Sequence, residues 1–202
     1  MTDELHSSSR LGLLACRWDG VRRAAASLLS ITWLRELLTA VLLAVVIIAF
    51  LYQPVKVEGT SMAPGLEDQE RVFINKFAYH FRPIERGDII VFRYPRDLSK
   101  SFIKRIVGLP GETIEIRSGR VYVNGVELQE AYLQEEPGGR QSSAPVTLPA
   151  DHFYVLGDHR SSSNDSRSWG PVHRRYMYGK AVFIYWPLER MGRVTRSGEM
   201  AR

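Results

Sequence analysis

One segment near the N-terminus stands apart in its hydrophobic pattern. Residues 37–52 read LLTAVLLAVVIIAFLY, sixteen positions without a charge. About 20 residues at 1.5 Å each are needed to cross a bilayer, and starting at Trp33 supplies that length. Trp33 and Tyr52 then bracket the run, as interfacial aromatic residues do. The pattern predicts a transmembrane anchor over residues 33–53, ended by Gln53 and Pro54.

Two other structures share part of this pattern. A buried core helix of this length carries a polar face, and this run has almost none. A cleaved signal peptide has a shorter apolar run, a shorter tail before it and a small-x-small site after it. Because the chain lacks these features, a retained anchor is expected.

The charges before the anchor predict its orientation. Arg10, Arg17, Arg22, Arg23 and Arg35 precede or begin the apolar run. By the positive-inside rule, residues 1–32 form a cytoplasmic tail. The rest of the chain then lies on the outer side of the cytoplasmic membrane, held by a single span that contacts membrane lipid.

Beyond residue 53 the pattern changes to short runs rich in Val, Ile, Phe and Tyr, separated by Gly and Pro. Such runs predict a mainly β domain over residues 54–190. Asn124-Gly125 lies between two of them, and this pair favours a two-residue hairpin. Residues 134–149 are turn-rich and predict a loop, and residues 191–202 form a polar tail. The predicted strands are 71–75, 88–94, 102–107, 113–116, 120–123, 126–128, 153–156 and 180–186.

Composition excludes several functions. The 27 Lys and Arg exceed the 22 Asp and Glu by five, but no basic block is long enough for a nucleic-acid tail. The lone Cys16 cannot form an internal disulfide. The five histidines show no metal-ligand spacing. We therefore expect no nucleic-acid partner, no metal and no cofactor.

Three segments carry candidate chemistry. Gly59–Pro64 reads GTSMAP, a turn that can expose the Ser61 hydroxyl, although serine in a turn is common. In the strand over 102–107, Phe102, Lys104 and Ile106 share one face. A buried lysine has a lowered pKa and can accept a proton from serine; a solvated edge lysine is the alternative. The third segment, residues 157–170, is rich in hydroxyls and charges, as an active-site loop or a plain surface loop would be.

Together the three segments resemble the bacterial type I signal peptidases. The resemblance covers roughly residues 33 to 187, with G-x-S-M-x-P, I-K-R-x-x-G-L-P-G and G-D-x-x-x-x-S-x-D-S-R-x-W-G in that order. It implies a fold of two antiparallel sheets, with a reduced second domain near residues 113–149. It also implies that exported preproteins are the substrates, cut after Ala-x-Ala.

The resemblance implies roles for individual residues. Ser61 is the nucleophile, Lys104 the general base, and Ser163 the hydroxyl that orients the base. Asp165 and Arg167 match a structural ion pair near the site. Residues at positions that line the substrate pockets in the family are Val57, Met62, Leu66, Val72, Phe102 and Ile103. The chain departs from the common family pattern at three positions. Gly59 stands where some members have a serine that helps to bind the oxyanion, and the other two departures are Thr60 and His159.

Three other functions are compatible with parts of the sequence. A soluble self-cleaving repressor with a Ser–Lys pair would carry a DNA-binding domain rather than an anchor. A Ser-His-Asp hydrolase using His159 or His152 would leave Lys104 unexplained and lacks a G-x-S-x-G elbow. A non-catalytic peptide-binding domain has no need of both Ser61 and Lys104. The sequence does not indicate an oligomeric state.

Overall fold

The computed structural model describes residues 32–133 and 141–194, so Cys16 and the four arginines before Arg35 lie outside the described residues. The chain divides into two compact units, residues 1–50 and 51–202. A helix over Thr32–Leu51, all of which except Leu51 belongs to the first unit, is long and apolar enough to cross a membrane, and its apolar stretch is not buried in protein. This helix agrees with the predicted anchor, although it ends before Gln53 and Pro54.

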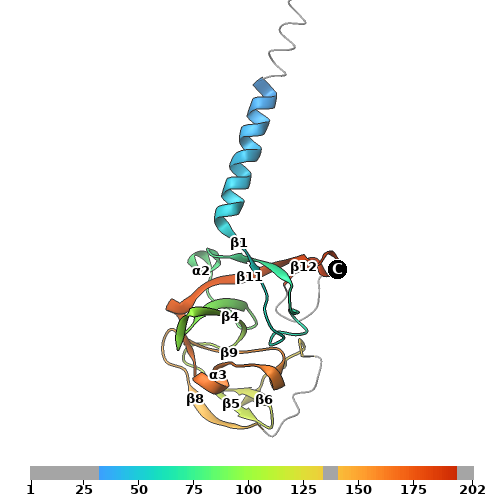
Figure 1. Ribbon diagram of the computed structural model, residues 1–202. Helices are drawn as coiled ribbons and strands as arrows, with labels where there is room; N and C mark the ends of the chain where they lie inside the picture. The colour runs from blue at the N-terminus through green and yellow to red at the C-terminus, as the bar shows by residue number, and fades with distance from the viewer. Residues whose placement is uncertain (1–31, 134–140, 195–202) are drawn as a thin grey trace, which may run out of the picture. The chain divides into compact units, whose positions relative to one another are not determined.

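The second unit is built around a large antiparallel sheet (Figure 1). Its strand order is β1-β2-β11-β3-β4-β9-β10, with β12 paired to β11. The bounds are β1 Tyr52–Lys56, β2 Arg71–Asn75, β3 Ile89–Tyr94, β4 Asp97–Gly108, β9 His152–Leu156, β10 Val172–His173, β11 Met177–Trp186 and β12 Gly192–Arg193.

Strand β1 was not predicted, and it contains the two residues expected only to end the anchor. Gln53 pairs with Ile74 and Pro54 with Phe73 of β2. Proline is tolerated here because β1 is at the edge of the sheet, where its missing N–H breaks no ladder. Among the described residues, no strand pairs with the other side of β1.

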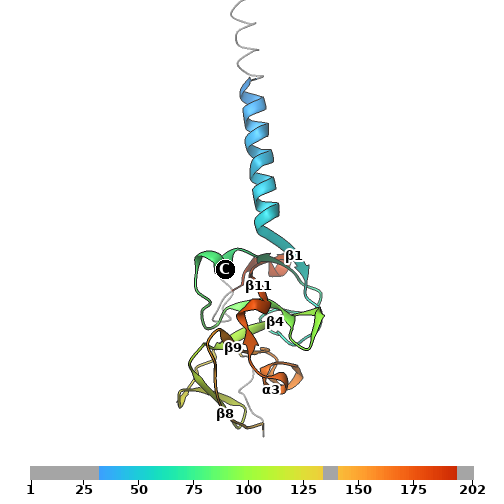
Figure 2. The ribbon, with the colours of Figure 1, turned by 90° about the vertical axis from the view of Figure 1, so that its left-hand side faces the viewer.

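The smaller sheet has the order β7-β6-β5-β8 and lies at the opposite end of this unit from β1 (Figures 1 and 2). Asn124 and Gly125 turn between β6 and β7 with φ of 52° and 83°, as predicted. Part of the expected loop is instead the strand β8, which pairs with β5. The bounds are β5 Thr113–Arg117, β6 Arg120–Val123, β7 Val126–Glu127 and β8 Ser143–Thr147.

Short helical turns connect the strands: α2 Ala78–Phe81, η1 Arg160–Ser162, α3 Ser166–Trp169, η2 Arg174–Tyr176 and η3 Leu188–Arg190. Three apolar clusters hold the unit together. One joins β1, β2, β3 and β11 to the segment that contains Met62 and Leu66. The second packs Ile90 and Ile106 against Phe153. In the third, Val107 and Leu156 of the large sheet meet Ile114 and Ile116 of the small one, so the two sheets share a core.

Candidate active site

Ser61 lies in a turn that is fixed from both sides. The Leu66 N–H donates to the Met62 carbonyl at 2.8 Å, and both of these side chains are fully buried. On the other side, the His159 N–H donates to the Ser61 carbonyl at 3.1 Å. The backbone of the turn is therefore tied to the core and to the segment that follows β9, while the Ser61 side chain is only partly buried.

Lys104 lies in the middle of the sheet, on β4. As the alternation predicted, Phe102 and Ile106 belong to one apolar cluster, while Ile103 packs against another. Lys104 pairs with Ile90 of β3 and is only 4% exposed. A solvated edge lysine is thereby excluded.

Ser61 and Lys104 meet although they are 43 positions apart. Lys104 Nζ lies 2.6 Å from Ser61 Oγ and donates a second hydrogen bond to the Ile103 carbonyl at 3.0 Å. Burial lowers the pKa of Lys104 to about 8, against the opposing effect of the Asp165 and Asp158 carboxylates. At pH 7 roughly a tenth of this amine is therefore uncharged, and the neutral form is the one that a general base requires.

The loop after β9 supports this pair. Asp165 is fully buried and accepts from the Gly157 N–H at 3.0 Å. Its two oxygens also accept from Arg167 Nε and Nη2, each at 2.8 Å. The expected ion pair of Asp165 and Arg167 is thus present, and it holds Gly157 in place.

Gly157 has no room for a side chain. A Cβ there would overlap the Ser61 carbonyl and the Ser163 side chain. Ser163 Oγ is buried and has no hydrogen-bond partner among the described residues, whereas Ser161 and Ser162 are exposed. The structure therefore shows no bond between Ser163 and Lys104, and the orienting role of Ser163 stays a prediction.

A groove of about 510 Å³ opens over the Ser61 hydroxyl. Among the predicted pocket residues, Val57, Phe102 and Ile103 line it. Met62, Leu66 and Val72 are instead fully buried in the core beneath, and they are not among its lining residues. The groove runs along β1 and the middle of β4, and its other lining residues are Val55, Lys56, Glu58, Gly59, Thr60, Val91, Ser101, Ser162, Asn164 and Tyr178.

Backbone amides near Ser61 differ in their availability. The Gly59 N–H donates to Asp68 Oδ1 at 2.7 Å, so it is already occupied. Among the described residues, the Ser61 N–H meets no hydrogen-bond acceptor. A free N–H on the nucleophile itself is well placed to stabilise a developing oxyanion.

Among the described residues, neither histidine considered as an alternative base bonds to the Ser61 hydroxyl. His152 packs edge-on against His173, with ring centroids 4.8 Å apart, and bonds to the Ala150 carbonyl. His159 contacts Ser61 through its backbone, and its buried Nδ1 has no partner in the described part of the chain. The residues the structure describes also contain no cluster of three potential metal ligands.

Comparison with known proteins decides the family. The family model described as signal peptidase, peptidase S26, matches residues 30–186. The chain belongs to the signal peptidase family. It is 43% identical over 161 residues to a signal peptidase I of Leptolyngbya laminosa, covering 76% of this chain and 78% of that one. It is also 40% identical to a probable signal peptidase I-2 of Synechocystis, covering 83% and 80%, and 34% identical to a signal peptidase I P of Bacillus subtilis subsp. natto, covering 80% and 91%.

Membership of the signal peptidase family makes the protein a serine peptidase that processes signal peptides. The family is membrane-associated, and the apolar N-terminal helix agrees with that. Sequence reasoning overlooked two features of the site: the close approach of Gly157 to Ser61, and the His159 N–H bond that fixes the Ser61 carbonyl. In the sequence, the glycine of the Gly-Asp pair at 157–158 was the one indication of the close approach to Ser61.

Proposed function

We propose that this signal peptidase cleaves exported preproteins after Ala-x-Ala, with Ser61 as nucleophile and Lys104 as general base. The observation that carries the proposal is the 2.6 Å separation of Lys104 Nζ and Ser61 Oγ, together with the burial that lowers the lysine pKa to about 8. No other titratable side chain bonds to the Ser61 hydroxyl within residues 32–133 and 141–194.

In the proposed reaction, neutral Lys104 takes the Ser61 proton as Oγ attacks the scissile carbonyl carbon. The Ser61 N–H stabilises the negative charge on the carbonyl oxygen. The C–N bond then breaks, the Lys104 ammonium gives its proton to the departing amine, and an ester to Ser61 remains. Lys104 next takes a proton from water, whose oxygen attacks the ester carbonyl. The bond from that carbon to Ser61 Oγ then breaks, Lys104 returns the proton to Oγ, and the signal peptide leaves as the carboxylic acid.

The groove supports an extended substrate. It lies along edge strand β1 and the segment of β4 that includes Ser101, Phe102 and Ile103. A substrate strand that pairs with this backbone points alternate side chains to the same face. Side chains one and three positions before the cut therefore enter the apolar part of the groove, near Val57 and Ile103, where small residues are required.

The test is cleavage of a preprotein by the full chain in detergent, with mass spectrometry of the products. The proposal expects one cut directly after Ala-x-Ala, and loss of that cut when the residue at the first position before it is Phe. A matched preprotein with Ala replaced by Gly at that position should still be cut. Equal cutting after Phe or Lys would contradict the proposed specificity.

We further propose an N-in topology with residues 54–202 outside, on the basis of the arginines before the anchor. In intact cells, an impermeant thiol reagent should then fail to label Cys16 until the membrane is permeabilised. A cysteine introduced by Ser99→Cys, on the exposed part of β4, serves as the outer control and should be labelled at once. Labelling of Cys16 in intact cells would overturn this topology.

A further inference from the structure

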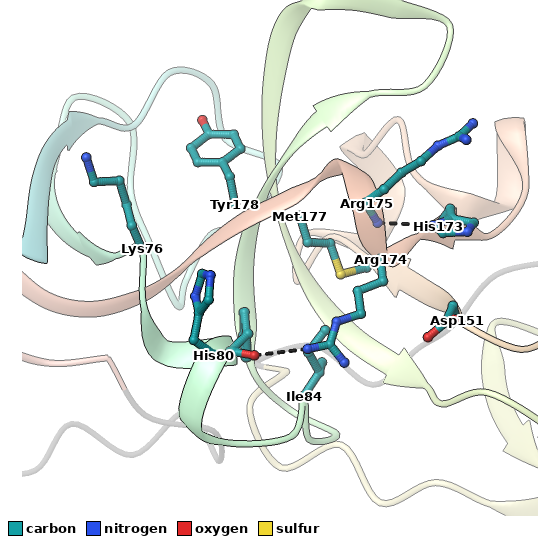
Figure 3. Close-up of a pocket in the computed structure, with 10 residues that line it drawn as sticks. Lys76, His80, Ile84, Asp151, His173, Arg174, Arg175, Met177 and Tyr178 are labelled. Atoms are coloured by element: carbon teal, nitrogen blue, oxygen red, sulfur yellow. Dashed lines mark hydrogen bonds between the residues drawn. The ribbon is translucent and has the colours of Figure 1, made fainter.

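A second cavity, of about 560 Å³, lies outside the groove that holds Ser61 and Lys104. Its walls come from the segment around α2, from η2 with His173 before it and the beginning of β11 after it, and from the turn that contains Asp151 (Figure 3). Ile84, which is buried, and Met177 give it an apolar floor. Nothing in the proposed peptidase mechanism uses this cavity.

The cavity is rich in positive charge. Lys76, Arg174 and Arg175 line it, whereas Asp151 is the carboxylate among its lining residues. In the part of the chain that the structure describes, none of these three cations forms an ion pair. Like charges that outnumber the counter-charge beside them repel one another, and an anion bound among them relieves that repulsion.

Arg174 is the cation that reaches into the cavity. Arg174 begins η2, and Figure 3 shows its side chain extending towards Ile84, with Lys76 and Arg175 on opposite sides. One terminal nitrogen, Nη2, donates to the Tyr79 carbonyl at 2.9 Å, which fixes the guanidinium. Its remaining N–H groups make no hydrogen bond among the described residues, and such a planar donor fork matches phosphate oxygens.

Lys76, which lines the cavity, is bonded through its backbone to the residue that ends the apolar helix. The Lys76 N–H donates to the carbonyl of Leu51, the last residue of that helix, at 3.3 Å. In the ladder of β1 and β2, Tyr52 pairs with Asn75, so the chain enters α2 beside the first residue of β1, which directly follows the apolar helix. Phe81 of α2 is 84% exposed, as an aromatic residue that contacts the bilayer interface would be.

We propose that this cavity binds the phosphate of an anionic phospholipid headgroup. Arg174 and Lys76 contact the phosphate oxygens, and Phe81 lies against the acyl boundary beside it. The inference requires that the N-terminal helix spans the membrane, and it is independent of the Ser61–Lys104 mechanism. An acidic peptide offers similar charge, but the direct connection to Leu51 and the exposed Phe81 favour a lipid.

The test uses the full chain in maltoside micelles with equal amounts of phosphatidylglycerol and phosphatidylcholine, and native mass spectrometry to count retained lipid. The wild type should retain more phosphatidylglycerol than phosphatidylcholine. The double variant Lys76→Gln/Arg174→Gln should lower that preference roughly 10- to 30-fold, at about 1 kcal/mol for each cation near an anionic surface. The matched control Arg93→Gln/Arg193→Gln removes two exposed cations elsewhere and should leave it unchanged.

Arg174→Lys should retain most of the preference, because it keeps the charge. Lys76→Gln alone removes no side-chain hydrogen bond of the described structure, so it remains informative if the double variant fails to fold.

Equal retention of both lipids, or equal loss in the double variant and its control, would overturn the proposal. Full displacement of the retained lipid by millimolar inorganic phosphate, or by an Asp-rich peptide, would also overturn the proposal. That result would show that the cavity binds a soluble anion instead of a lipid. Cleavage of preprotein in detergent should persist in every variant, which separates this test from that of the peptidase.

Discussion

Lys104 Nζ lies 2.6 Å from Ser61 Oγ, at the junction of a strand in the middle of the sheet and a turn that directly follows edge strand β1. The lysine is held by burial, and the serine turn is held by hydrogen bonds and by the buried side chains of Met62 and Leu66. The two groups are thus positioned by separate parts of the fold before any substrate binds.

The pKa of Lys104 sets the expected pH dependence. The base acts as the neutral amine, so protonation below a pKa of about 8 removes activity. The rate of cleavage, as kcat/KM, should rise about tenfold per pH unit up to pH 7 and level off above pH 8 to 9. The check is a pH–rate profile on one peptide substrate. A profile governed by a pKa near 6.5 would instead indicate a histidine base.

Ser163 should matter more than its two neighbours. Its hydroxyl is buried without a partner in the described structure, whereas Ser161 and Ser162 are exposed. If Ser163 orients Lys104, Ser163→Ala should lower kcat by a factor of about 10²–10⁴, the range of general-base contributions. Ser161→Ala and Ser162→Ala are the matched controls and should be near neutral. A larger loss in either control than in Ser163→Ala would refute the assignment.

Gly157→Ala should inactivate the enzyme through crowding. The new Cβ would overlap the Ser61 carbonyl and the Ser163 side chain, so the turn that carries the nucleophile must shift. We expect a loss in kcat of at least about 10²-fold, since misplacement of about 1 Å has that effect. Overpacking should also cost about 1–3 kcal/mol in the free energy of unfolding. Wild-type cleavage and thermal stability in this variant would show that the backbone here is not constrained as described.

The buried ion pair of Arg105 and Asp158 predicts a stability effect. Arg105 Nε and Nη2 donate to the two Asp158 oxygens at 2.8 and 2.7 Å, and both side chains are 1% exposed. Asp158→Asn leaves the guanidinium without its counter-charge, which should destabilise the fold by about 3–5 kcal/mol. Asp97→Asn breaks the exposed pair with Lys100 and should cost at most about 1 kcal/mol. Thermal unfolding of both variants in detergent is the measurement, and similar melting temperatures would contradict the prediction.

The strands that could be predicted from the sequence are those marked by a short run of β-branched and aromatic residues. The runs at 71–75 and 120–123 are confirmed as β2 and β6. The alternation in β4 left a buried and a solvated Lys104 both open, and the structure shows the buried one. Strand β8 was missed because Pro145 and the polar run Gln141, Ser142 and Ser143 before it favour a loop. Proline is tolerated there only because β8 is at the edge of the small sheet.

The site could be predicted only in part for a physical reason. Whether an apolar residue faces a groove or the core depends on tertiary packing, so Val57 and Met62 looked equivalent in sequence. The approach of Lys104 to Ser61 depends on how the turn after β1 folds over the sheet, which no local pattern specifies. The motifs predicted that Ser61 and Lys104 belong to the site, whereas the distance between them follows from the fold.

The most direct test of the Ser61–Lys104 mechanism is single-turnover cleavage of a preprotein by Lys104→Arg. A guanidinium does not deprotonate in proteins, so this variant keeps a positive charge but has no base. Cleavage should fall by at least about 10²–10⁴-fold at every pH from 7 to 10, as it should in Ser61→Ala, while thermal unfolding confirms that each variant is folded. Substantial cleavage by folded Lys104→Arg would show that another group activates the serine.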